Sequence, residues 1–138
     1  PQNPKTPSIF LLPSANIYKN ILILYHMDLF IGILYGIVAQ ILTFLQLQGN
    51  IKWGFLQKYP ILTLLSAVPL SYMFLKSVEH IVKSFNGEIW PSRLIGFSIG
   101  IIVFALMSYL IFKEPITLKT VICLILGMII LAIQILWR

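Results

Sequence analysis

Four long apolar runs, separated by short polar connections, constrain this chain more than any other feature of its sequence. A helix that crosses a bilayer needs about 20 mostly apolar residues. Lipid offers the backbone no hydrogen-bond partner, so a run of this length in a membrane must be helical. The four runs are Leu29–Leu47, Tyr59–Lys76, Leu94–Phe112 and Val121–Trp137. They predict an all-α membrane protein, a bundle of four transmembrane helices with short loops.

The composition agrees with a membrane location. Only 10% of the 138 residues are charged and 59% are hydrophobic, whereas soluble domains average about 25% charged residues. The net charge of +6 is spread between the apolar runs, without the clustered patch that a nucleic-acid site requires. These basic residues are expected to flank the membrane near lipid headgroups. The expected partners are therefore membrane lipids and not nucleic acid.

The polar connections are too short to hold a soluble domain. Gln48–Lys58, Lys83–Arg93 and Lys113–Thr120 each contain glycine, asparagine or proline, the residues that favour turns. Neighbouring helices must therefore run antiparallel. Pro69 is expected to kink the second span, and Glu114 is a candidate cap for the fourth.

Residues 1–26 are expected to form an N-terminal extension, and residues 27–138 the transmembrane domain. Prolines at positions 1, 4, 7 and 13 argue against an early helix, which predicts a partly disordered start. The apolar but interrupted segment Ile17–His26 predicts an interfacial helix that continues into the first span, with a fifth span as the alternative. Met27 also resembles a natural start, and no signal-peptide pattern is evident.

The basic residues predict little preference for either orientation. Six lie on the side of the two termini and four on the other, and omitting Lys5 and Lys76 leaves four against four. The positive-inside rule then favours neither orientation. Equal counts also arise by chance in small samples, and the alternative is insertion in both orientations as an antiparallel pair. The ten residues are Lys5, Lys19, Lys76, Lys83, Arg93 and Arg138 against Lys52, Lys58, Lys113 and Lys119.

One face of the first span holds the most informative polar residue. Gly32, Gly36, Gln40 and Thr43 share a helix face, where small residues let another helix approach and an amide in hydrocarbon needs a partner. Helix packing and solute binding by Gln40 and Thr43 are both open interpretations. Further packing glycines are Gly96, Gly100 and Gly127. The aromatic candidates for solute binding are Tyr35, Tyr72, Trp90 and Tyr109, of which Trp90 also fits an interfacial belt.

No pattern in the sequence indicates catalysis or a bound cofactor. Cys123 is the only cysteine and the two histidines, His26 and His80, are far apart, so no metal-ligand spacing exists. No Ser-His-Asp set, paired carboxylates or phosphate loop is evident, and an enzyme is not expected. Lys76, Glu79 and Lys83 have the spacing of ion pairs on one helix, which predicts a solvated helix end.

Several segments together resemble the small multidrug resistance proteins of the drug/metabolite transporter superfamily. Gly100–Leu118 is similar to the third helix of that family and its following loop, and Lys113–Thr117 resembles the loop's Glu-Pro or Glu-Arg motif. Tyr59-Pro60 is similar to the aromatic-Pro start of the second helix. The resemblance runs from about Met27 to the end. It implies a homodimeric transporter, expected in a bacterial inner membrane.

This sequence departs from the family's pattern at the residue that couples transport to protons. The family's exporters carry a proton-binding glutamate where this chain reads Ile37-Val38-Ala39-Gln40, and Gln40 cannot ionise. The third-helix tryptophan of the family falls on Gly96, and its glycine-rich fourth helix retains only Gly127. We therefore expect movement of a small amphipathic or lipid-like solute by alternating access without the usual acid. The alternatives are a non-transporting accessory subunit of a larger membrane complex and a component of a lipid-linked sugar flippase.

Overall fold

Helices account for nearly all of the chain that the structure describes. In this computed structural model residues 15–137 are described, and the predictions for residues 1–14 and Arg138 lie outside them. No strand occurs among the described residues. The elements are α1 (Ala15–Trp53), α2 (Phe55–Lys58), α3 (Pro60–Ser84), α4 (Trp90–Met107), the π-helical turn η1 (Ser108–Phe112) and α5 (Leu118–Leu136).

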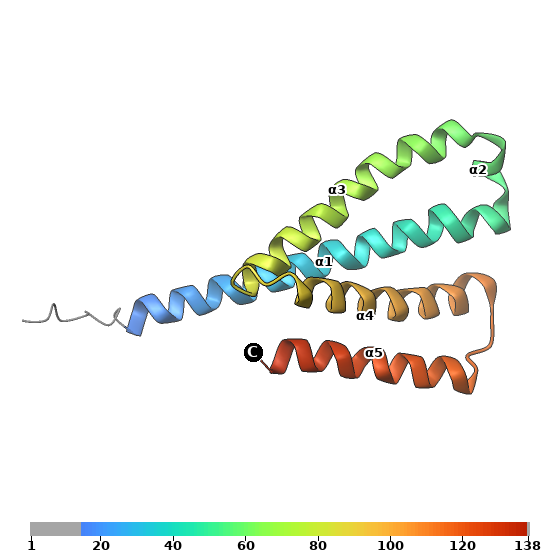
Figure 1. Cartoon of the computed structure of the whole chain (residues 1–138). Coiled ribbons are helices and arrows are strands. Elements are labelled where there is room, and N and C mark those ends of the chain that lie inside the picture. The colour runs from blue at the N-terminus through green and yellow to red at the C-terminus, as the bar shows by residue number, and fades with distance from the viewer. Residues whose placement is uncertain (1–14, 138) are drawn as a thin grey trace, which may run out of the picture.

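Four of these helices are long and apolar enough to cross a membrane, which confirms the expected fold class. The candidate spans are Leu22–Trp53, Pro60–Ser84, Trp90–Phe112 and Leu118–Leu136. Successive spans are antiparallel, as Figure 1 shows. Over residues 15–137 the chain is therefore an all-α integral membrane protein with four transmembrane helices and short connections.

α1 is much longer than the span expected from the sequence. Its 39 residues correspond to about 58 Å of helix, nearly twice the thickness of a hydrocarbon core. The segment 17–26 is helical, as predicted, and continues α1 without a break at the expected boundary between residues 26 and 27. In Figure 1 it projects beyond the other helices. Its location in the membrane interface stays a prediction.

The helix ends correct the sequence expectations in two places. The connection predicted at 48–58 is mostly helical, and it turns at Gly54, whose φ of +61° is readily adopted only by glycine. The predicted cap Glu114 is wrong, because the N-cap of α5 is Thr117, whose side chain accepts a hydrogen bond from the Thr120 amide at 3.3 Å. α3 runs through Pro69 and ends at Ser84.

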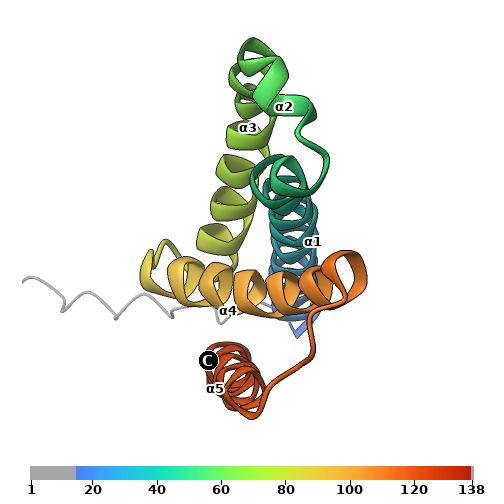
Figure 2. The ribbon, with the colours of Figure 1, turned by 90° about the vertical axis from the view of Figure 1, so that its right-hand side faces the viewer.

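The four spans form a bundle in which α1, α3 and α4 meet one another and α5 packs mainly on α4. α1 packs against α3 and α4, and α5 packs on α4; Figure 2 shows α4 crossing between α1 and α5. The buried core lies where α1, α3 and α4 meet and consists of Leu29, Ile81, Phe85, Ile95, Ile99 and Val103. Only 6% of the residues in the most apolar stretch of α3, and likewise of α5, are buried. Most of the surface of these two helices therefore faces lipid or a partner.

Candidate functional site

The glycine face of α1 lies directly against α3. A Cβ on Gly32 would come within 2.7 Å of the Ile81 side chain, and a Cβ on Gly36 within 3.0 Å of Ser77 Oγ. Ser77 Oγ donates a hydrogen bond to the Gly32 carbonyl at 2.7 Å. The absence of a side chain at these positions brings the two backbones together. This end of the α1–α3 pair is therefore tightly closed.

Gln40, one turn further along α1, faces α4. A Cβ on Gly100 would lie 3.0 Å from the Gln40 amide nitrogen. Gly100 is ten residues from Trp90 and twelve from Phe112, the two ends of its span, which places it about 15 and 18 Å from them. The amide of Gln40 is thus near the middle of the membrane. It forms no hydrogen bond with any residue in the described part of the chain.

Two cavities meet at Gln40, along successive stretches of α4. The first, the α4–α5 cavity, has a volume of about 450 Å³ and reaches from Gln40 to the loop before α5. The second, the α1–α3–α4 cavity, has a volume of about 430 Å³ and reaches from Gln40 to the start of α4. Both are lined by Gln40, Gly96 and Phe97. Volumes of this size suit a small organic ligand.

Each cavity ends at a charged residue. Arg93 lines the α1–α3–α4 cavity and Glu114 lines the α4–α5 cavity. Neither forms an ion pair with another residue in the range 15–137. The walls between these charges are mainly apolar, including Phe97, Ile101 and Phe104. Gln40 therefore contributes an unpaired polar group midway along a mainly apolar path between two charged ends.

Of the other candidates for solute binding, Tyr109 lines a cavity, whereas Thr43, Tyr72 and Trp90 do not. Tyr109 lines the α4–α5 cavity. Thr43 Oγ1 donates a hydrogen bond to the Ala39 carbonyl at 2.8 Å, which is the usual way for a hydroxyl to be satisfied within a helix. Tyr72 and Trp90 are exposed, at 58% and 78%, and line neither cavity.

The remaining glycines differ in their surroundings. Gly96 has no atom within 4 Å of an added Cβ and lines both cavities. Gly127 of α5 is buried, and a Cβ added there would lie 3.9 Å from the Ser98 carbonyl oxygen. Gly127 therefore lies in the α4–α5 contact. Gly96 instead leaves space beside Gln40.

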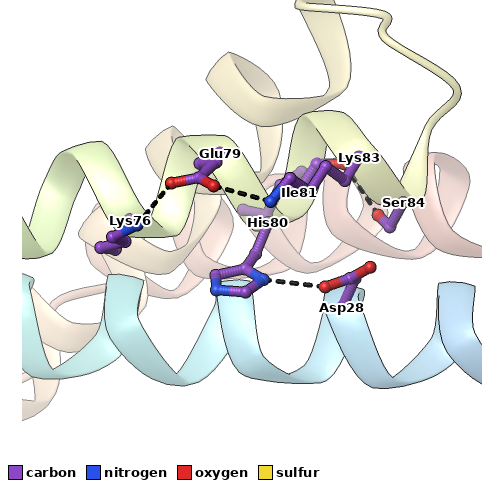
Figure 3. Close-up of polar contacts among 7 residues, drawn as sticks. All are labelled: Asp28, Lys76, Glu79, His80, Ile81, Lys83 and Ser84. Atoms are coloured by element: carbon purple, nitrogen blue, oxygen red, sulfur yellow. Dashed lines mark hydrogen bonds and ion pairs between the residues drawn. The ribbon is translucent and has the colours of Figure 1, made fainter.

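A polar cluster at the Ser84 end of α3 is separate from the two cavities. His80 Nδ1 lies 2.8 Å from Asp28 Oδ1 of α1, and the ring of Tyr35 stacks on His80 with centroids 6.1 Å apart. Figure 3 shows this pair beside the ion pairs of Glu79 with Lys76 and Lys83, at 2.8 and 2.6 Å. The predicted pairing within α3 is confirmed. The Asp28–His80 pair was missed, because it depends on the register of α1 against α3.

Sequence reasoning also missed the role of Arg93, Glu114 and Phe97 in lining the path. Phe97 lies in an apolar run, where nothing in the sequence distinguishes a cavity-facing side chain from a lipid-facing one. Cys123 and Ser108 also line the α4–α5 cavity. Ser108 and Cys123 interrupt apolar runs in the sequence, and this interruption was the signal from which their position in a cavity could have been predicted.

Comparison with known proteins finds no relative. No protein-family model matches the chain, and neither the curated proteins nor the solved structures contain a match. The resemblance to the small multidrug resistance proteins therefore stays a prediction.

Proposed function

We propose that this protein moves a small amphipathic or lipid-like solute across a membrane by alternating access. The observation that supports the proposal most is the placement of Gln40, an unpaired amide at mid-membrane depth that two cavities share. An intramembrane polar group without a partner is costly unless it meets water or a ligand. Gln40 is proposed as the central contact of the solute's polar group, and Phe97 as part of its apolar surroundings.

The division of the helices suggests how access alternates. α1 pairs with α3 and α4 pairs with α5, and the two hairpins meet mainly along α1 and α4. The connection between them contains Asn86 and Gly87, with φ of 53° and 93°. Rocking one hairpin against the other would open the path toward Arg93 or toward Glu114 in turn. Because Gln40 carries no ionisable group, the cycle is proposed to run without a proton-binding acid at this position.

Substitution of Gln40 by glutamate tests the proposal without knowledge of the natural solute. A carboxylate at the meeting point of the cavities attracts a hydrophobic cation, and its charge depends on pH. We expect purified Gln40→Glu protein in detergent to bind tetraphenylphosphonium increasingly as pH rises, while Gln40→Leu shows no such dependence. Binding that is equally weak and pH-insensitive in both variants would contradict a ligand-accessible Gln40.

An accessory subunit of a larger membrane complex is the second candidate. It is favoured by the exposed surface of α3 and α5, where the buried residues among those described are only Ser77, Ile81 and Ser84 of α3 and Gly127 of α5. The same surface is compatible with a homodimer, which we propose for the transporter in a bacterial inner membrane. Purification in a mild detergent distinguishes these assemblies. The transporter proposal predicts a dimer of this chain alone, and the accessory-subunit proposal predicts constant copurification of other chains.

A further inference from the structure

α1 and α3 diverge toward α2 and leave an apolar cleft between them. The glycine face of α1 closes the pair at the Ser84 end of α3, and the ribbons of α1 and α3 diverge toward α2 (Figures 1 and 2). The resulting α1–α3 cleft has a volume of about 400 Å³. It is lined by Leu42, Leu45, Gln46, Gly49, Asn50 and Trp53 of α1 and by Ser66, Pro69 and Leu70 of α3. Gln40 does not line it, so the cleft is distinct from the proposed solute path.

The polar groups in the cleft already have partners. Gln46 Nε2 donates to the Thr63 carbonyl at 2.8 Å and to Ser66 Oγ at 3.1 Å, and Ser66 Oγ donates to the same carbonyl at 2.9 Å. Asn50 Oδ1 accepts a hydrogen bond from the backbone N–H of Gln57 at 2.8 Å. These bonds join α1 to α3 and α2 and leave mainly hydrocarbon surface for an occupant. A polar solute would gain few hydrogen bonds here, whereas an apolar chain fits the remaining surface.

The cleft extends from the membrane interior to its interface. Gln46 is six residues beyond Gln40, about 9 Å along the helix, and Trp53 is thirteen residues beyond it, about 20 Å. With Gln40 near the bilayer centre and a hydrocarbon half-thickness of about 15 Å, Trp53 lies at headgroup level. An acyl chain that enters from the interface follows the same course. The ring of Trp53 lies over Gly49, where an added Cβ would come within 2.8 Å of it.

The connection beside the mouth of the cleft is basic. The segment from Gln48 to Tyr59 contains Lys52 and Lys58 and no acidic residue. Lys52 Nζ donates a hydrogen bond to the Ile111 carbonyl of η1, which leaves Lys58 to interact with a headgroup. Lys58 forms no ion pair with any residue between 15 and 137, and it follows Gln57, whose amide is bonded to the cleft residue Asn50. A basic side chain at headgroup level attracts anionic lipid. An anionic headgroup therefore complements the mouth, and an acyl chain complements the walls.

We propose that the α1–α3 cleft binds one acyl chain of an anionic glycerophospholipid, whose phosphate is paired with Lys58. A second helix is a poorer occupant, because a helix is about 10 Å across and the Gln46–Thr63 and Gln46–Ser66 bonds hold α1 and α3 together within the cleft. The bound lipid stabilises the divergence of the two helices that the structure shows.

Quenching of Trp53 fluorescence by brominated lipid tests this site. The protein carries Trp90→Phe and Trp137→Phe, so that only Trp53 emits, and is reconstituted in phosphatidylcholine vesicles. Chain-brominated phosphatidylglycerol or phosphatidylcholine then replaces the host lipid in steps. Since one lysine near the surface favours anionic lipid by about fivefold, phosphatidylglycerol should displace phosphatidylcholine from Trp53 about five times more readily than random replacement predicts. The Lys58→Gln variant should lose that preference.

A matched pair of substitutions on α3 separates the cleft from the surrounding bilayer. Ser66→Phe fills the cleft, whereas Ser71→Phe adds the same ring at an exposed position outside it. Preferential quenching should disappear in the first variant and persist in the second. Leu70→Phe provides a second filling variant if Ser66→Phe does not fold. Two results would overturn the proposal. One is quenching of Trp53 that simply follows the mole fraction of each brominated lipid in the protein without a filling substitution. The other is equal quenching in Ser66→Phe and Ser71→Phe.

Discussion

Gly100 of α4 faces the side-chain amide of Gln40 of α1, and a Cβ at Gly100 would lie 3.0 Å from the amide nitrogen and 3.4 Å from its carbon. The two helices therefore meet at mid-membrane depth through a polar side chain and a glycine. The contact supplies van der Waals packing but no hydrogen bond for the amide. This distinguishes Gln40 from Gln46, whose amide is bonded to α3 at 2.8 Å.

The first prediction concerns the stability of Gln40→Leu. An interhelical hydrogen bond in a membrane contributes about 0.6 kcal/mol on average and up to about 1.7 kcal/mol. Because the Gln40 amide has no bond to lose among the described residues, the free energy of unfolding should change by less than about 0.5 kcal/mol. Unfolding in mixed micelles, followed by circular dichroism, measures this change. Gln46→Leu is the matched control and should be destabilised by a larger amount. Equal losses in the two variants would show that Gln40 has a hydrogen-bond partner.

The second prediction concerns the closed end of the α1–α3 pair. Gly32→Ala places a Cβ 2.7 Å from the Ile81 side chain and 3.1 Å from the Ser77 carbonyl. Overpacking of this kind costs about 1–3 kcal/mol, so the variant should unfold at a lower denaturant concentration. Gly96→Ala is the control, since nothing lies within 4 Å of its added Cβ. A Gly32→Ala protein as stable as Gly96→Ala would contradict the close approach of α1 and α3.

The third prediction concerns the Asp28–His80 pair, which joins α1 to α3 at 2.8 Å. The two side chains are 21% and 22% exposed, so solvent screens them only in part. A double-mutant cycle with Asp28→Asn and His80→Gln should give a coupling energy of about 1 kcal/mol. Glu79→Gln should change stability by less than about 0.5 kcal/mol, since its partners lie on its own helix. A coupling indistinguishable from zero would contradict a stabilising contact between Asp28 and His80.

The sequence was sufficient to locate the four spans, because an uninterrupted apolar run in lipid has few conformations open to it. It was less informative about helix ends. Lys76, Glu79 and Lys83 were predicted to lie at a solvated helix end, and they occupy the last turns of α3, which ends at Ser84. The polar residues at 48–50 resemble a loop, but α1 continues to Trp53 and turns only at Gly54.

The candidate site was predictable only in part. The shared face of Gly32, Gly36 and Gln40 followed from helix periodicity. Their different neighbours did not, since Gly32 and Gly36 contact α3 while Gln40 contacts α4. That difference depends on the crossing of three helices. The roles of Arg93 and Glu114 depend on the same arrangement, because each lies in a connection or at a helix start and is brought to a cavity by tertiary packing.

The fourth prediction concerns orientation. Near-equal numbers of basic residues flank the two ends of the spans, so a reporter fused after Arg138 should be detected on both sides of the membrane. Lys113→Gln with Lys119→Gln removes positive charge from the connection before α5 and from the first turn of α5. This double variant should shift the termini toward the cytoplasm. Detection of the original fusion on one side only would contradict dual insertion but leave the four-span fold intact.

Labelling of a thiol at position 40 tests the central claim most directly. Thiols react as thiolates, which do not form in hydrocarbon, so a water-soluble methanethiosulfonate labels only a position that water reaches. In a Cys123→Ser background, Gln40→Cys is compared with Val38→Cys, which lies on the exposed face of α1 at nearly the same depth. If the two cavities form a solute path, the reagent should label position 40 in reconstituted vesicles and leave position 38 unlabelled. Failure to label position 40, or equal labelling at both positions, would contradict the account.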